Sequence, residues 1–227
     1  MVFPFIAVAL SAASTAIMGT VSTIGASVAS FAASVGPALA TAVQAIQPIA
    51  QSVATFANSL LQTVGILQPG ETIYTLGERA LQAAAKEITL ETVADLDSYL
   101  ADIRALEIDP ELQAQRSPAE QLLSGLGLAT VALERRFNVE TGRFNGLWLL
   151  PLANPGYFTP ERMQSLIGTA DFGDKVLQYL DKELSGGDTM RFEKKLETPE
   201  TPQKNLYAAL DEARHNWAQL AQQLEQQ

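Results

Sequence analysis

Few residues in this sequence have the types and spacing that catalysis or metal binding requires. The chain has one histidine, His215, and no cysteine, so it cannot assemble the nitrogen and sulfur ligands of a zinc site. Asp95 and Asp97 resemble an acid–base pair, but residues two apart on a helix project to different faces. We therefore predict no catalytic residue, no metal site and no cofactor.

Longer sequence motifs lead to the same prediction. The sequence has no P-loop, no G-x-G-x-x-G after a strand and no G-x-S-x-G. Its net charge is −10 and it has no basic cluster, which argues against sequence-specific binding of nucleic acid, because phosphate contacts need grouped Lys and Arg. The composition favours a non-enzymatic protein.

Charge is distributed very unevenly along the chain. All 15 basic and all 25 acidic residues lie within 71–227, and Glu71 is the first charged residue. The change falls at Gln68-Pro69-Gly70. We therefore predict an uncharged segment, 1–70, which is rich in Ala, Ser and Val, an acidic helical domain, 71–200, and a C-terminal amphipathic helix, 201–227.

The larger apolar residues of the uncharged segment recur with a mean spacing of about 3.6 residues, the period of an α-helix. This apolar stripe comprises Ile17, Val21, Ile24, Val28, Phe31, Val35, Leu39, Val43, Ile46, Val53, Phe56 and Leu60. Pro37 and Pro48 interrupt the pattern, because proline removes a backbone donor and clashes with the preceding turn. The pattern predicts a kinked rod, or two or three helices in series.

The face opposite the stripe carries small or neutral polar residues, which allow helices to approach closely. Three interpretations follow: a membrane-inserting element that oligomerises, a segment buried among neighbouring subunits, or a helix packed on its own C-terminal region. The run from Phe5 to Gly36 is long enough to span a bilayer. It is also rich in Ser and Thr and has no flanking Lys or Arg to orient it.

The charged region has regular helix-start signals. Ser117-Pro118-Ala119-Glu120 has the pattern of a capping box, and a cap followed by proline recurs at Asp109, Thr159 and Thr201. Apolar spacing predicts helices over 90–107, from Pro118 to about Arg136, and over 172–184. Because no segment alternates like a strand, we predict an all-α fold.

An aromatic-rich stretch, 137–162, separates these helices. It contains Phe144, Trp148 and Tyr157 together with several Gly, Pro and Asn residues. The stretch could be a docking loop, because aromatic residues dominate binding hot spots. It could also be a connection whose aromatic side chains cover the helical core, which is the interpretation that we favour.

The last predicted helix, 203–227, has a heptad-like seam. Its apolar positions are Leu206, Leu210, Ala213, Trp217, Leu220 and Leu224. The seam can pack on its own domain, which we favour, or associate with another subunit. The preceding linker, LETPETPQ, is polar and proline-rich, which is typical of a hinge.

The stretch FAASVGPALATAVQAIQPIAQSVATFANSLL resembles membrane-active virion proteins of bacteriophages, meaning tail or DNA-ejection proteins. The resemblance implies a many-copy structural component whose partners are itself, other assembly proteins and a lipid bilayer. The alternatives are a secreted helical pore-forming toxin subunit and an assembly protein that never contacts lipid. We expect a virion, secreted or membrane-associated location. We expect no cleaved signal peptide, because the apolar start lacks a basic n-region.

Overall fold

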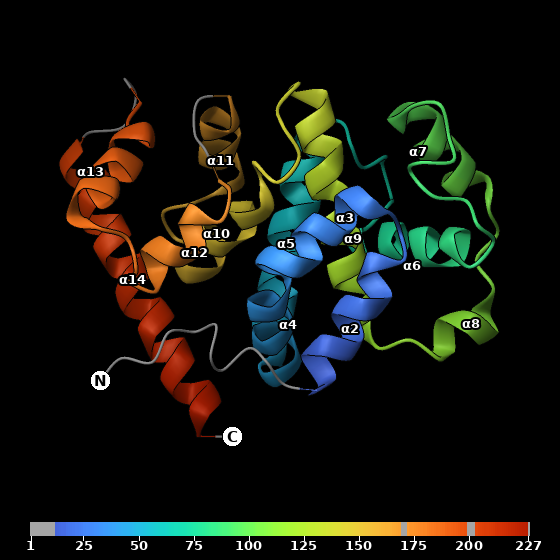
Figure 1. Ribbon diagram of the computed structural model, residues 1–227, viewed down its shortest axis with the longest axis horizontal. Coiled ribbons are helices and arrows are strands. Elements are labelled where there is room, and N and C mark those ends of the chain that lie inside the picture. Colours follow the sequence, from blue (N-terminus) through green and yellow to red (C-terminus); the bar gives the residue numbers. More distant parts are fainter. Residues whose placement is uncertain (1–11, 169–171, 199–202, 227) are drawn as a thin grey trace.

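A computed structural model describes residues 12–168, 172–198 and 203–226, and every secondary-structure element in these ranges is helical (Figure 1). The all-α prediction is therefore confirmed. The α-helices are α2 (Ala12–Ser22), α3 (Ala26–Ser34), α4 (Gly36–Ala45), α5 (Gln47–Thr63), α6 (Ile73–Ala84), α7 (Leu96–Ala105), α8 (Pro110–Ala114), α9 (Pro118–Arg136), α10 (Leu149–Ala153), α11 (Pro160–Ile167), α12 (Lys175–Leu180), α13 (Gly186–Lys195) and α14 (Gln203–Glu225). A 3₁₀ turn, η1 (Asn145–Trp148), precedes α10.

Helix α9 is the centre of the fold. Every residue from 122 to 134 is buried. Apart from Glu134, these residues are apolar or small on all faces of the helix, so each face needs a packing partner. Helices α2, α3, α4, α5 and α6 pack against it. In Figure 1, α6 to α8 lie at one end of the molecule and α10 to α14 at the other, with the uncharged helices between them.

The uncharged segment forms four helices in the described region, one more than the sequence predicts. α4 and α5 each begin with a proline in the first turn, at Pro37 and Pro48. The additional break lies between α2 and α3, where the side chains of Ser22 and Thr23 bond backward to main-chain carbonyls. Such local hydrogen bonds compete with helix continuation, which explains a break without proline.

The helix starts of the acidic region follow its capping residues. Ser117 and Glu120 form a complete capping box at the start of α9. The helix predicted over 90–107 is shorter, however, because Asp95 caps α7 and residues before it are turns. The helix predicted over 172–184 is likewise limited to α12. The cap predicted at Thr201 and part of the linker, 199–202, lie outside the described residues.

The three parts of the sequence share one hydrophobic core. Residues of α2 to α5, of α6, α7 and α9 to α13, and of α14 belong to a single buried cluster, whereas α8 has no buried residue. The change in composition at Gln68-Pro69-Gly70 is therefore not a boundary between separately packed units.

Candidate functional site

The apolar stripe of the uncharged segment lies inside the molecule. Ten of its residues are buried, and the other two, Ile46 and Phe56, are partly buried against the core. Val28 and Phe31 pack against α9 at Gly127, where a Cβ atom would lie 2.8 Å from Val28 and 3.1 Å from Phe31. The buried residues are Ile17, Val21, Ile24, Val28, Phe31, Val35, Leu39, Val43, Val53 and Leu60.

This packing corresponds to the third interpretation, in which the stripe packs on the chain's own C-terminal region. The sequence proposal that these side chains face lipid or neighbouring copies does not describe this conformation. The physical reason is that α9, in which every residue from 122 to 134 is buried, offers an apolar surface within the same chain. Burying that surface is favourable at roughly 25 cal/mol per Å².

What the uncharged segment presents to solvent is its small-residue face, which we call the neutral face. Its exposed positions on α2 and α5 contain Ala, Gly, Ser, Thr, Gln and one Pro and carry no charge. They are Ala12, Ala13, Thr15, Ala16, Gly19, Gln47, Pro48, Gln51, Ser52, Thr55, Ser59, Gln62 and Thr63. A surface of this length without Lys or Glu is unusual on a helix that faces water.

Carboxylates from the acidic region tie the uncharged helices in place. Glu91 Oε1 accepts a 2.8 Å hydrogen bond from the Ala26 amide at the start of α3. Thr20 donates to Glu120 at 3.4 Å, and Ser34 donates to Asp174. A carboxylate at a helix start satisfies an unpaired amide and interacts favourably with the helix dipole. The uncharged helices thus depend on residues distant in sequence for such contacts.

Membrane-spanning capacity is limited in the described residues. No single helix there has the length and hydropathy needed to cross a bilayer. Helices α3 and α4 meet these criteria only as a pair, and they are bent by 66° at their junction. Most of the larger apolar side chains of this pair face the core, as described above.

The aromatic-rich stretch is mainly a cover for the core. Phe144 and Trp148 are buried, and Trp148 Nε1 donates a 2.9 Å hydrogen bond to Thr130 on α9. Tyr157 is partly buried, with the Arg162 guanidinium 3.9 Å from its ring centroid. The docking candidate is corrected for Phe144 and Trp148, because neither side chain is accessible to a partner.

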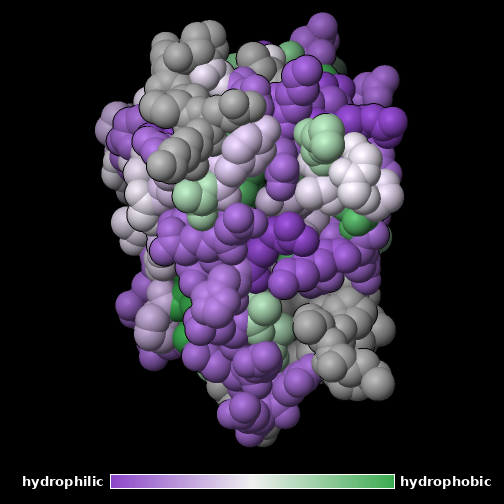
Figure 2. Space-filling model, turned by 90° about the vertical axis from the view of Figure 1, so that its left-hand side faces the viewer, coloured by the Kyte–Doolittle hydropathy of each residue, from purple (hydrophilic) through white to green (hydrophobic). Residues whose placement is uncertain are grey.

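The C-terminal seam also packs within the chain. Leu206, Leu210, Trp217, Leu220 and Leu224 are buried, and α14 contacts α4, α10 and α12. Trp217 Nε1 donates to Asp181 at 2.9 Å. The outward face over α13 and α14 is mostly hydrophilic (Figure 2).

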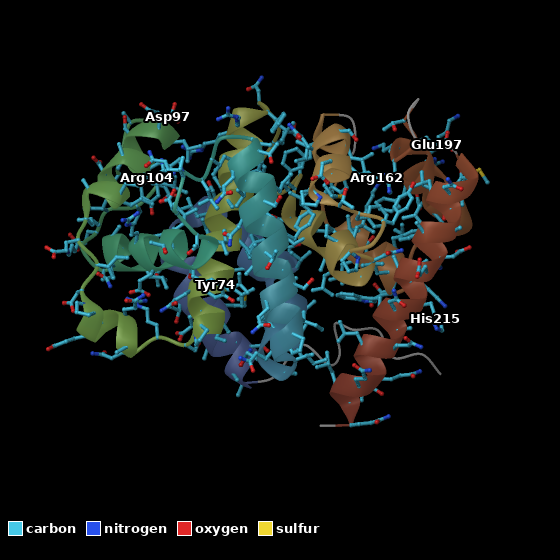
Figure 3. The ribbon with its side chains drawn as sticks, turned by 180° about the vertical axis from the view of Figure 1, so that it is seen from behind. Tyr74, Asp97, Arg104, Arg162, Glu197 and His215 are labelled. Carbon is cyan, nitrogen blue, oxygen red and sulfur yellow. The ribbon has the colours of Figure 1, made fainter. Side chains whose placement is uncertain are left out.

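His215 lies exposed on α14, 3.0 Å from the Gln219 amide nitrogen (Figure 3). In the ranges that the structure describes, no three His, Cys, Asp or Glu residues are arranged to hold a metal ion. Asp95 and Asp97 are both exposed at the start of α7, where Asp95 caps the helix. Its hydrogen bonds to Ser98 lower the pKa of the Asp95 carboxyl.

Fold and site together define an all-helical protein with one core, built around a buried central helix and bearing a neutral exterior face. Comparison with known proteins adds no family: no family model matches the chain, and no curated protein or solved structure is significantly similar to it.

Proposed function

We propose that this protein is a non-enzymatic structural component of a multi-subunit assembly, in which copies associate through the neutral face. The observation that carries the proposal is the absence of charge on the exposed surfaces of α2 and α5. Small, uncharged side chains can be buried against a neighbour without the cost of desolvating an ion. The resemblance to phage tail or DNA-ejection proteins supports a virion component as the class of assembly.

The neutral face consists of two surfaces, one on α2 and one on α5, and their positions support repeated contacts. Helix α2 lies toward the viewer in Figure 1, and α5 lies toward the viewer in Figure 3, the opposite side. A copy can therefore meet one neighbour through α2 and another through α5. Contacts between different faces generate rings or filaments, as a many-copy component requires.

The test is light scattering of the full chain after size-exclusion chromatography over a range of concentrations. We expect particles larger than a monomer, and we expect Thr55→Glu with Ser59→Glu on α5 to dissociate them. Both positions are exposed and one turn apart, so the substitutions place charge on the neutral face without entering the core.

The matched control is Gln222→Glu with Gln226→Glu, which adds the same charge at the same spacing at exposed positions near the C-terminus. The control should associate like the unmodified chain. A chain that is monomeric at every concentration would refute the proposal, and so would association that resists the α5 substitutions.

A second candidate function is membrane insertion of α3 and α4, as in an ejection component or a helical pore-forming toxin. Its supporting observation is that this bent pair has the length and composition of one span. Insertion would require α3 and α4 to leave α2 and α9. A staple between α2 and α4 tests this requirement directly.

Ser14 and Thr41 are suitable positions for the staple, because their hydroxyl oxygens are 3.0 Å apart. The chain has no cysteine, so Ser14→Cys with Thr41→Cys introduces the only thiols. If α3 and α4 insert, liposome flotation and dye release should be lost in the oxidised protein and recovered on reduction. Flotation that the staple does not change, or no flotation in either state, would rule out this route.

A further inference from the structure

A pocket of about 490 Å³ opens between α7, the last turn of α9 and the turn that follows α5. Its volume is in the range typical of sites for small ligands. The apolar part of its lining comes from Ile66, Leu96, Leu100 and Ala132, while Arg104, Arg135 and Arg136 contribute three guanidinium groups. The uncharged segment contributes Gly65 and Ile66, so this pocket forms only when the two parts of the chain are packed together.

Arg104 is a fixed wall of the pocket. Its Nη2 donates to the Ile66 carbonyl at 2.7 Å and to Glu71 Oε2 at 2.8 Å, and its Nε donates to both Glu71 oxygens at 3.2 Å. The Glu71 side chain is almost fully buried and also pairs with Arg79. The positive charge of Arg104 is therefore paired with Glu71, and these contacts fix the position of the Arg104 side chain. Figure 3 shows Arg104 on α7, the helix that also carries Asp97.

Arg135 and Arg136 differ from Arg104, because both are exposed and neither forms an ion pair with any residue that the structure describes. The Arg136 guanidinium lies beside Gly65, with Nη2 3.5 Å from the place where a Cβ atom would be. A Cβ atom at this distance would make only an ordinary van der Waals contact, so it is the φ of +72° that favours glycine here. Two guanidinium groups at one opening are available to a ligand.

Two acidic residues, Asp95 and Asp97, also line the pocket, and the Asp95 carboxylate is attracted to the Arg135 guanidinium. Both carboxylate oxygens of Asp95 are occupied at the start of α7, by the Ser98 amide at 2.8 Å and the Ser98 hydroxyl at 3.0 Å. Asp97 is exposed in the first turn of α7. Apart from Arg104, whose charge is paired with Glu71, the lining has two guanidinium and two carboxylate groups. The pocket is therefore less acidic than the chain as a whole, which has 25 acidic and 15 basic residues.

We propose that this pocket binds a phosphate monoester attached to a compact apolar group. Arg135 and Arg136 hold the phosphate, because guanidinium groups form paired, charge-assisted hydrogen bonds with phosphate oxygens. Ile66 and Leu100 contact the apolar group. The proposal is independent of the assembly function, because the pocket does not include the neutral faces of α2 and α5. The ligand is either a soluble phosphate monoester or the headgroup of an anionic phospholipid.

The experiment is calorimetric titration of the full chain with hexyl phosphate, inorganic phosphate and hexanol. We expect one-to-one binding of hexyl phosphate, with weaker binding of inorganic phosphate and none of hexanol. Arg135→Gln with Arg136→Gln should weaken hexyl phosphate binding at least about tenfold, since each lost ionic hydrogen bond is of that order. These side chains are exposed, so the substitutions leave the core intact.

The control, Arg191→Gln with Lys194→Gln on α13, removes the same charge at a distance from the pocket. It should bind hexyl phosphate like the unmodified chain. Flotation with phosphatidic acid vesicles distinguishes the sources: arginine-dependent flotation without binding of the soluble probe identifies the lipid headgroup. The proposal is overturned if the chain binds neither hexyl phosphate nor the vesicles. It is also overturned if the double substitution at the pocket and the double substitution on α13 weaken binding equally.

Discussion

Gly77 on α6 and Gly125 on α9 face each other where the two helices cross. A Cβ atom on Gly77 would lie 1.9 Å from the Gln121 carbonyl oxygen and 2.6 Å from the Gly125 amide nitrogen. A Cβ atom on Gly125 would lie 2.2 Å from the Ile73 carbonyl oxygen. These are contacts with backbone atoms, which cannot move aside without shifting a helix. The crossing of α6 and α9 therefore requires glycine on both sides.

We predict that Gly77→Ala lowers the free energy of unfolding by about 3 kcal/mol, the upper part of the range for overpacked cores. Urea denaturation followed by circular dichroism measures this change. Gly19→Ala is the control, because Gly19 lies within α2 and a Cβ atom there meets nothing within 4 Å. The control should gain about 0.5–1 kcal/mol from alanine's better helix propensity. If Gly77→Ala were as stable as the control, α6 and α9 would not be in backbone contact at this crossing.

The contact between Glu91 and the Ala26 amide gives a second prediction. Glu91→Ala removes the side chain that caps α3 from a distance, where Gly25 at the N-cap position has no side chain to do so. The loss of such a cap costs about 1 kcal/mol. Hydrogen exchange should become faster for the first amides of α3, while exchange in α9 should follow only the change in global stability. Glu107→Ala, at an exposed position after α7, should leave α3 unchanged, and equal acceleration in both variants would contradict the capping role.

Local sequence signals predict where several helices start, but they do not predict the contacts that helices make with residues distant in the sequence. The capping box at Ser117 and the prolines at 37 and 48 act through neighbouring residues, so sequence alone reveals them. The capping of α3 by Glu91 joins residues 65 positions apart, and no local pattern indicates it. Helix α7 is also shorter than predicted, because Asp95 caps its first turn and the residues before Asp95 form turns.

The apolar stripe shows a second limit. Periodicity identifies which side of a helix is apolar. It does not identify what covers that side, because lipid, a neighbouring subunit and α9 can each bury it. The signal that favours α9 is in its own sequence, LLSGLGLATVAL, which is apolar or small on every face and therefore needs partners all round. The pocket beside Arg135 and Arg136 was not predicted, because its lining comes from three separate segments.

The buried hydrogen bond between Trp148 and Thr130 gives a third prediction. The Thr130 hydroxyl accepts from Trp148 Nε1 and donates to the Leu126 carbonyl, and both side chains are buried. Thr130→Val keeps the shape but leaves the indole N–H without a partner, which should cost about 1–3 kcal/mol in urea denaturation. Thr63→Val, at an exposed position on α5, should change stability by less than about 0.5 kcal/mol. If Thr130→Val combined with Trp148→Phe costs as much as the sum of the two single changes, the hydrogen bond does not couple them.

The fourth prediction concerns Glu134, a buried carboxyl near the end of α9. Burial raises the pKa of this group from its ordinary value of 4.5, although hydrogen bonds from the Gly142 and Phe144 amides act in the opposite direction. Since the folded state holds the proton more tightly than the unfolded state, this group favours folding at low pH. That contribution is lost as the pH rises through the raised pKa.

Glu134→Gln isolates this effect, because a glutamine oxygen can still accept from both amides but does not ionise. We expect the variant to gain stability relative to the unmodified protein as the pH rises above the ordinary pKa of 4.5, and the difference to level off once the pH has passed the raised pKa of Glu134. Urea denaturation at several pH values measures it, and Glu107→Gln, exposed after α7, should show no such rise. If Glu134→Gln instead becomes progressively less stable than the unmodified protein toward neutral pH, the two amide hydrogen bonds stabilise the ionised carboxylate more than burial destabilises it.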